Sequence, residues 1–308
     1  MSRRRKGREL NGWLVIDKPA GMTSTDVVNR VRRLLDARKV GHGGTLDPLA
    51  TGLLPLAFGE ATKTVSYVMD GAKTYRFTLR WGERRDTDDA EGEVEATSDS
   101  RPGEAEILAL LPRFLGEIAQ VPPRYSAIKV DGQRAYDLAR DGETVELTAR
   151  QVRIDSFELL ELPDADHAVF EARCGKGTYI RSLARDLGAA LGCHAHVVAL
   201  RRLTVGPFTE DGAISLESLE RLSDCAAAVE KLLPVETGLD DIPAVVLTDA
   251  EARRLRNGQA ISMLVRSNAE RIHGLESGDT ICAMAEGKPV AIVRLEAGEL
   301  RPVRVLNL

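Results

Sequence analysis

The chain has 308 residues, of which 43% are hydrophobic and 29% are charged. These proportions are ordinary for a globular protein, and the length suits one large domain with a smaller one. A net charge of −5 excludes a generally basic nucleic-acid-binding protein. The charge is uneven, however, because residues 1–81 hold 15 Lys and Arg against 7 Asp and Glu. A local basic surface that binds phosphate is therefore compatible with the acidic whole.

Several classes of protein are excluded by what the sequence lacks. No run of about 18 apolar residues predicts a membrane span, and no apolar segment follows the basic N-terminus as in a secretory signal. The four cysteines are scattered and form no CxxC pair, which is typical of free thiols in a reducing compartment. Cys193, His194 and His196 have no second ligand cluster, so we interpret them as strand residues rather than a zinc site. We expect a cytoplasmic protein without a metal.

The first elements are a strand, a turn and a helix. Residues 11–17 (NGWLVID) predict a short strand, and KPAGM (18–22) predicts a turn. Ser24 or Thr25 is the expected cap of a helix whose apolar residues, from Val27 to Leu35, follow the helical period.

Residues 41–56 read GHGGTLDPLATGLLPL and hold a single carboxylate, Asp47. An aspartate before a proline is most often a helix cap or a turn residue. An isolated carboxylate in a glycine-rich loop beside an apolar run is also suited to chemistry. The residues of this stretch alone do not decide between the two.

The next segments alternate in character. Residues 60–69 predict a short helix, and KTYRFTLRWG (73–82) alternates apolar and polar residues as a strand with one buried face does. We interpret residues 86–96 (DTDDAEGEVEA) as a solvated turn or an insertion. Residues 104–117 predict an amphipathic helix.

The later segments complete a mixed pattern. Residues 167–174 predict a strand, and GKGTYIRSLARDLGAALG predicts a helix that places Arg181 and Arg185 on a face other than the apolar one. The irregular order of strands and helices predicts an α+β fold, with a mixed, largely antiparallel sheet flanked by helices. A turn-rich stretch at 236–244 predicts a boundary, so we expect domains at 1–242 and 243–308, the second small and β-rich.

Several motifs resemble those of the TruB-type tRNA pseudouridine synthases, and they occur in the same order as in that family. They are KPAGMTS (18–24), GHGGTLDPLATGLLPLAFGEATK (41–63), KTYRFTLRWG (73–82), PPRYSAIKVDGQRAY (122–136), KGTYIRSLARDLG (176–188) and LRRLTVGPF (200–208). The resemblance covers most of residues 11–211, and the C-terminal module resembles a PUA-type RNA-binding domain. One departure is Arg85, which stands where the family usually has threonine, so the resemblance assigns no role to the loop that contains Asp89.

The resemblance implies the pseudouridine synthase fold and an isomerase that converts uridine 55 in the TΨC loop of tRNA to pseudouridine. It implies that no cofactor is needed and that the protein binds the T arm of tRNA. We expect the protein to be a monomer. The reaction needs a carboxylate nucleophile, as at an anomeric carbon in a retaining glycosidase. The resemblance gives this role to Asp47, and whether the attack is on C1′ of the ribose or C6 of the base stays open.

Other roles also follow only from the resemblance. Tyr75 would stack on the flipped uracil and take a proton late in the reaction, Arg181 would pair with Asp47, and Tyr179 and Leu200 would line the uracil pocket. His42 would enter the gap that the flipped base leaves. A clamp segment at about 120–150 would hold the RNA loop, with Arg124, Lys129, Arg134 and Arg140. Lys18, Lys63 and the N-terminal arginines are further candidates for phosphate contacts.

Two other functions remain open at this stage. The chain could be an RNA-binding protein or tRNA-folding chaperone that uses the same surface, alone or in addition to catalysis. It could also be a guide-RNA-directed rRNA pseudouridine synthase of the archaeal and eukaryotic type. The clamp sequence RYSAIKVDGQRAY and the absence of a long Lys-rich tail favour the form that acts without a guide.

Overall fold

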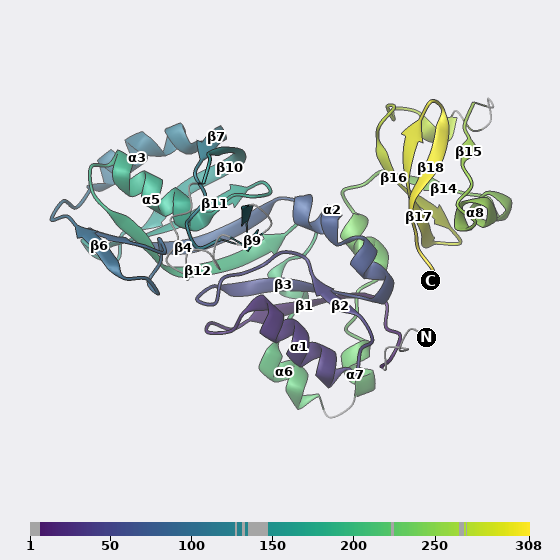
Figure 1. Ribbon diagram of the computed structural model, residues 1–308, viewed down its shortest axis with the longest axis horizontal. Coiled ribbons are helices and arrows are strands. Elements are labelled where there is room, and N and C mark those ends of the chain that lie inside the picture. The colour runs from purple at the N-terminus through teal and green to yellow at the C-terminus, as the bar shows by residue number, and fades with distance from the viewer. Residues whose placement is uncertain are drawn as a thin grey trace.

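The computed structural model of the chain contains two main sheets, a nine-stranded one and a five-stranded one at the C-terminus (Figure 1). The structure describes the chain except for residues 1–6, 127, 131–132, 135–146, 223–224, 265–267 and 269. The N-terminal arginines before residue 7, and about half of the predicted clamp segment, including Arg140, lie outside the described residues. No described helix is long and apolar enough to cross a membrane.

The nine-stranded sheet is mixed and largely antiparallel, as predicted. β1 pairs with β13 and β3 with β12 in parallel, and the other neighbours are antiparallel. The strands follow the order β13 (Ala213–Ser215), β1 (Gly12–Lys18), β3 (Thr51–Phe58), β12 (Ala195–Val205), β4 (Lys73–Trp81), β11 (His167–Cys174), β10 (Arg150–Glu161) and β7 (Gly116–Gln120), with β2 (Val40–His42) paired to β3. The predicted alternation of β4 is confirmed, since its odd-numbered residues are buried.

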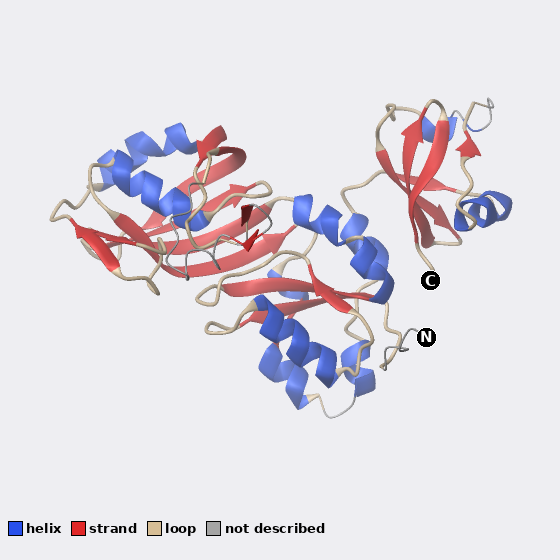
Figure 2. Cartoon of the chain, in the orientation of Figure 1, coloured by secondary structure: helices blue, strands red, loops and turns tan. Residues whose placement is uncertain are grey.

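Helices cover this sheet in two groups (Figures 1 and 2). One group, beside β1 and β3, is α1 (Ser24–Leu34), α6 (Leu216–Arg221) and α7 (Cys225–Val229); the other, beside β4 and β11, is α3 (Glu104–Leu110) and α5 (Ile180–Ala190). Val27 and Val31 of α1 and Leu183 and Leu187 of α5 belong to one apolar core. Both groups therefore stabilise one continuous sheet by burying apolar surface against it.

Several sequence-based boundaries were wrong. Thr23, not Ser24 or Thr25, caps α1, because its side chain accepts a hydrogen bond from the Asp26 amide in a capping box. The predicted helix at 60–69 is a 3₁₀ turn (Gly59–Lys63) followed by α2 (Val65–Asp70). The predicted helix at 104–117 ends earlier, in a 3₁₀ turn (Leu111–Phe114) before β7, where Pro112 cannot continue the helical hydrogen bonds.

The remaining elements are short, apart from the C-terminal sheet. Two hairpins, β5 (Glu83–Arg85) with β6 (Val94–Thr97) and β8 (Lys129–Val130) with β9 (Gln133–Arg134), and three 3₁₀ turns (Glu210–Gly212, Val235–Leu239 and Glu270–Ile272) complete the connections. The C-terminal sheet has the order β14 (Ala244–Val246), β16 (Thr280–Ala285), β17 (Lys288–Glu296), β18 (Glu299–Val305) and β15 (Ile261–Ser262), and α8 (Asp249–Arg256) packs against it.

The chain returns to its N-terminal part after β18. Lys63 Nζ donates to the Val305 carbonyl at 2.8 Å, and the Asn307 amide donates to Glu60 at 2.7 Å. Between them, Leu306 is 1% exposed and lies in an apolar cluster with Trp13 and other residues of the nine-stranded sheet. The C-terminal residues therefore connect the small sheet to the large one through hydrogen bonds and apolar packing.

The burial of Leu306 gives a stability prediction. Leu306→Ala should lower the free energy of unfolding by about 2–5 kcal/mol, as expected when a buried leucine side chain is truncated. Denaturation in urea, followed by tryptophan fluorescence, measures this change. Leu308→Ala is the matched control, because Leu308 is 47% exposed and such a change costs less than about 0.5 kcal/mol. Equal effects of the two substitutions would contradict the packing of Leu306.

Candidate active site

The loop that carries Asp47 connects β2 to β3 and is held on both sides of the carboxylate. Before it, the Leu46 amide donates to Ser24 Oγ at 2.8 Å, and Ser24 Oγ donates to the Leu46 carbonyl at 3.1 Å. After it, the Pro48 carbonyl accepts from Lys18 Nζ at 3.2 Å and from the Gly21 amide at 2.8 Å. The Asp47 side chain remains 31% exposed. The backbone is thus fixed while the carboxylate stays accessible.

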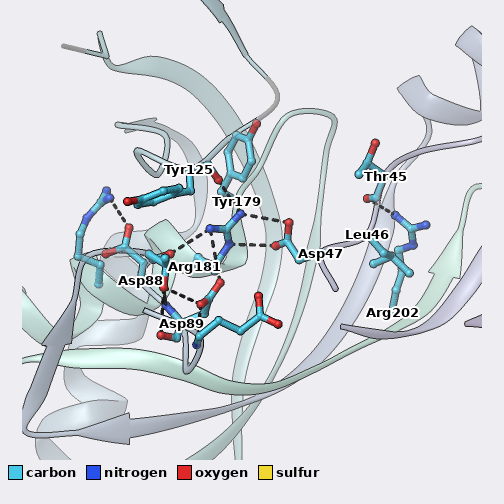
Figure 3. Close-up of polar contacts among 12 residues, drawn as sticks. Thr45, Leu46, Asp47, Asp88, Asp89, Tyr125, Tyr179, Arg181 and Arg202 are labelled. Carbon is cyan, nitrogen blue, oxygen red and sulfur yellow. Dashed lines mark hydrogen bonds and ion pairs between the residues drawn. The ribbon is translucent and has the colours of Figure 1, made fainter. Parts of the chain in front are cut away.

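Arg181 binds the Asp47 carboxylate side-on (Figure 3). Nη2 donates to Oδ1 at 3.1 Å, and Nε lies 2.9 Å from Oδ2. The Nε contact is close but poorly aligned for a hydrogen bond, so the Nη2 bond supplies the directional part of the ion pair. Arg181 is 4% exposed and stands in the first turn of α5.

The rest of the Arg181 guanidinium is also occupied. Nη1 donates to the Thr87 carbonyl at 2.9 Å and lies 3.5 Å from Asp89 Oδ2, and Nη2 also donates to the Tyr125 carbonyl at 3.0 Å (Figure 3). Asp89 is itself fixed, because its Oδ1 accepts from Thr87 Oγ1 at 2.6 Å. Arg181 therefore has little freedom to leave Asp47.

The acidic loop between β5 and β6 is part of this site, which corrects the interpretation of residues 86–96 as a solvated turn. Asp88 and Asp89 are 6% and 3% exposed. Asp88 Oδ2 accepts from Arg185 Nη1 at 2.9 Å, so Arg185 does not simply face the solvent. Burial raises the pKa of Asp88 to about 6, although the nearby guanidinium of Arg185 acts in the opposite direction. No sequence signal separated these two carboxylates from the other acidic residues nearby.

Tyr75 and Leu200 lie on neighbouring strands beside the loop. Tyr75 of β4 is 9% exposed, and Leu200 of β12, 7% exposed, pairs with Phe77 two residues further along β4. Burial raises the pKa of the Tyr75 hydroxyl, and the charge of Asp47 also raises it. The Tyr75 hydroxyl therefore keeps its proton at neutral pH and lies within electrostatic range of Asp47.

Tyr179 is held at the start of α5 by Gln120, which sequence reasoning missed. The Tyr179 amide donates to Gln120 Oε1 at 2.8 Å, and Gln120 Nε2 donates to the Tyr179 carbonyl at 3.2 Å. The Arg150 guanidinium lies 4.9 Å from the centre of the Tyr179 ring, a cation–π contact. Figure 3 places Tyr179 beside Arg181 and Asp47.

His42 ends β2, five residues before Asp47, and is half-buried. Among the described residues, its Nδ1 has no hydrogen-bond partner. Burial lowers the pKa of His42, and the charge of Arg202 lowers it further. The imidazole is therefore neutral at neutral pH.

The two lysines considered for phosphate contacts have other partners. Lys18 is fully buried and donates to the carbonyls of Pro19, Met22 and Pro48, so its prediction as a phosphate contact was wrong. Burial lowers the pKa of Lys18 to about 8, which the charge of Asp47 partly offsets. Lys63, 27% exposed, is engaged by Glu60 and Val305.

Within the described ranges, no three His, Cys, Asp or Glu side chains form a group that could hold a metal ion. Cys193 and His194 precede β12 rather than lying in it, and His196 is buried in the strand with Nδ1 3.1 Å from the Glu83 carbonyl oxygen. The site contains an accessible carboxylate held by a buried arginine, with a buried tyrosine nearby. Such a carboxylate is suited to nucleophilic attack.

Comparison with known proteins agrees with this fold. Residues 32–180 match the TruB family pseudouridylate synthases (N-terminal domain), and residues 181–240 match the tRNA pseudouridylate synthase B C-terminal domain. The fold and the matched sequence define a pseudouridine synthase, an isomerase. The chain belongs to the TruB family.

Full-length relatives share more than half of the sequence. The proteins named tRNA pseudouridine synthase B from Rhodospirillum rubrum and Caulobacter vibrioides are 58% and 54% identical, each over 100% of both chains. Among solved structures, one titled as a Cbf5-Nop10-Gar1 complex matches with a TM-score of 0.73 and 27% identity, covering 96% of this chain and 84% of the other.

The lowered pKa of His42 predicts a pH dependence of stability. The ordinary pKa of histidine is 6.5. When the pH falls below this value, His42 binds a proton in the unfolded chain but not yet in the folded protein. This difference lowers the stability of the folded protein as the pH falls. Compared with His42→Gln, the wild type should lose free energy of unfolding between pH 7.5 and pH 5.5. Urea denaturation of both proteins over this range measures the difference, and a constant difference would contradict the buried, neutral imidazole.

Proposed function

We propose that this chain isomerises uridine 55 in the T arm of tRNA to pseudouridine, with Asp47 as the nucleophile. The observation that carries the proposal is the ion pair of Asp47 with Arg181, in which the arginine side chain is 5% exposed and the aspartate side chain 31% exposed. The arginine orients the carboxylate, while an edge of the carboxylate stays open to a substrate.

The proposed reaction moves one bond within the nucleotide. Asp47 attacks C1′ of the ribose or C6 of the base, and the bond from N1 to C1′ breaks. The base turns, C5 forms a bond to C1′, and the bond between Asp47 and carbon breaks, which frees the carboxylate. The proton on C5 leaves, and N1 gains a proton. No oxidation or reduction takes place, so the reaction proceeds without a cofactor.

The other site residues receive roles around this nucleophile. The Tyr75 ring stacks on the uracil, and its hydroxyl relays the late proton. Tyr179 and Leu200 line the pocket. His42, neutral and half-buried beside the loop, enters the gap left by the flipped base. Extrusion of the base costs a few kcal/mol, which contacts along the RNA must offset.

Tight binding of the RNA is assigned to two further parts. The clamp at about 120–150 holds the loop of the T arm, and residues 243–308 form a PUA-like RNA-binding domain. The family match ends at residue 240 and β14 begins at Ala244, which supports a boundary between them.

The proposal that the enzyme acts on free tRNA, without a guide RNA, is supported by a comparison of sequence identities. The relatives named tRNA pseudouridine synthase B are 54% to 58% identical to this chain, whereas the chain in the Cbf5 complex is 27% identical. We place the enzyme as a monomer in the cytoplasm, where tRNA is modified.

Replacement of the nucleophile tests the proposal. Asp47→Asn keeps the size of the side chain but removes its charge, and it should lower the rate of pseudouridine formation in a tRNA transcript by more than about 10³-fold. Binding of tRNA, measured by filter retention, should change little. Full activity in this variant would exclude Asp47 as the nucleophile.

Asp166→Asn is the matched control. Asp166 also pairs with an arginine, Arg101, but its side chain is 49% exposed and it lies beyond the far end of β4. The activity of Asp166→Asn should equal that of the wild type.

A wild-type protein that binds tRNA but forms no pseudouridine would instead support a binding or chaperone function.

A further inference from the structure

Arg202 is a buried cation that binds backbone carbonyls. It is 1% exposed, and its guanidinium donates to Leu53 at 2.8 Å, to Gly44 at 3.0 Å and to Thr45 at 3.3 Å. No ion pair joins it to a carboxylate in the part of the chain that the structure describes. A buried charge is costly unless it is paired or fully hydrogen-bonded. Packing alone therefore does not explain an arginine here.

The backbone of Arg202 is fixed between two strands. It pairs with Gly52 of β3 on one side and with Tyr75 of β4 on the other. The approach to β3 is close, because a Cβ atom on Gly52 would lie 2.2 Å from the Arg202 carbonyl oxygen, and φ of Gly52 is +95°. Only glycine suits that position. The side chain of Arg202 thus starts from a rigid point opposite Tyr75.

Two of the three carbonyls that Arg202 binds belong to the nucleophile loop. Gly44 and Thr45 stand three and two residues before Asp47, and Figure 3 shows the contact of Arg202 with Thr45 beside the carboxylate. Arg181 approaches the same carboxylate from α5. One arginine therefore holds the side chain of Asp47, and the other holds the backbone from which it extends.

We propose that Arg202 is a positioning residue, which fixes the loop carrying Asp47 relative to Tyr75 on the neighbouring strand. This inference rests on the proposed function, since it concerns the same nucleophile. A displacement of about 1 Å in a reacting group can cost on the order of 10²-fold in rate. A cation suits this role better than a neutral donor, because hydrogen bonds from a charged group are stronger.

The charge of Arg202 also acts on the groups around the loop. Burial raises the pKa of Tyr75, and Arg202 opposes that rise; burial lowers the pKa of His42, and Arg202 adds to that fall. Burial lowers the pKa of Lys18, Asp47 and Glu91 raise it, and Arg202 lowers it further. Loss of this charge should therefore change the pH profile of the reaction, which a purely structural role would not do.

The test uses Arg202→Met and Arg202→Lys in the full-length protein with a tRNA transcript. Single-turnover rates of pseudouridine formation and the Kd for tRNA are measured from pH 6 to pH 9. Arg202→Met, similar in length but uncharged, should lose on the order of 10²-fold in rate, while its Kd stays within about threefold of the wild type. Arg202→Lys keeps the charge and should recover part of the rate. The rate of Arg202→Met should also respond to pH differently from that of the wild type.

Arg201→Met is the matched control, because the adjacent arginine lies at the surface with Asp17 and Glu210. It should keep the wild-type rate. If Arg202→Met fails to fold, as judged by thermal unfolding, the comparison of Arg202→Lys with the wild type decides. A folded Arg202 variant with the wild-type rate and pH profile, in a protein whose wild type is active, overturns this inference alone. An inactive wild type would instead overturn the proposed function.

Discussion

The buried guanidinium of Arg181 is the feature on which the candidate site depends. It binds Asp47 and Asp89 by charge and the carbonyls of Thr87 and Tyr125 by hydrogen bonds. Three segments that are distant in sequence thereby meet at one side chain. A buried ion pair of this kind contributes little net stability, but removal of one partner leaves an unpaired charge, which is costly. The contacts of Arg181 therefore fix the positions of these segments relative to one another.

The nine-stranded sheet supplies the rigid frame for this arrangement. Strand β12 lies between β3, which follows the Asp47 loop, and β4, which carries Tyr75. Helix α5 packs on the same core and presents Arg181 from its first turn. Because side chains on strands and helices are better fixed than those on loops, the loop residue Asp47 is held by Arg181 of helix α5.

Much of the fold could be predicted from periodicity and motifs, and the family resemblance predicted the pair of Arg181 with Asp47. The other pairs of charges could not be predicted. The alternation in β4 and the helical period of α5 are local signals, and both elements were predicted. The start of α5 was placed too early, because the helix begins at Ile180, after the two glycines of the preceding turn. Arg181 and Arg185 are the same residue type one turn apart, and each contacts a carboxylate of the loop between β5 and β6, more than 90 residues earlier: Arg181 contacts Asp89, and Arg185 contacts Asp88. Arg201 and Arg202 are adjacent, yet one lies at the surface and the other is buried. Only the three-dimensional structure separates Arg201 from Arg202.

The most direct measurement of the central claim is a map of pseudouridine, at single-nucleotide resolution, in an unmodified tRNA transcript treated with the purified protein alone. The account predicts one new pseudouridine, at position 55 in the T arm, formed without a metal, nucleotide or guide RNA. Absence of any pseudouridine, or its formation only at other positions, would contradict the account.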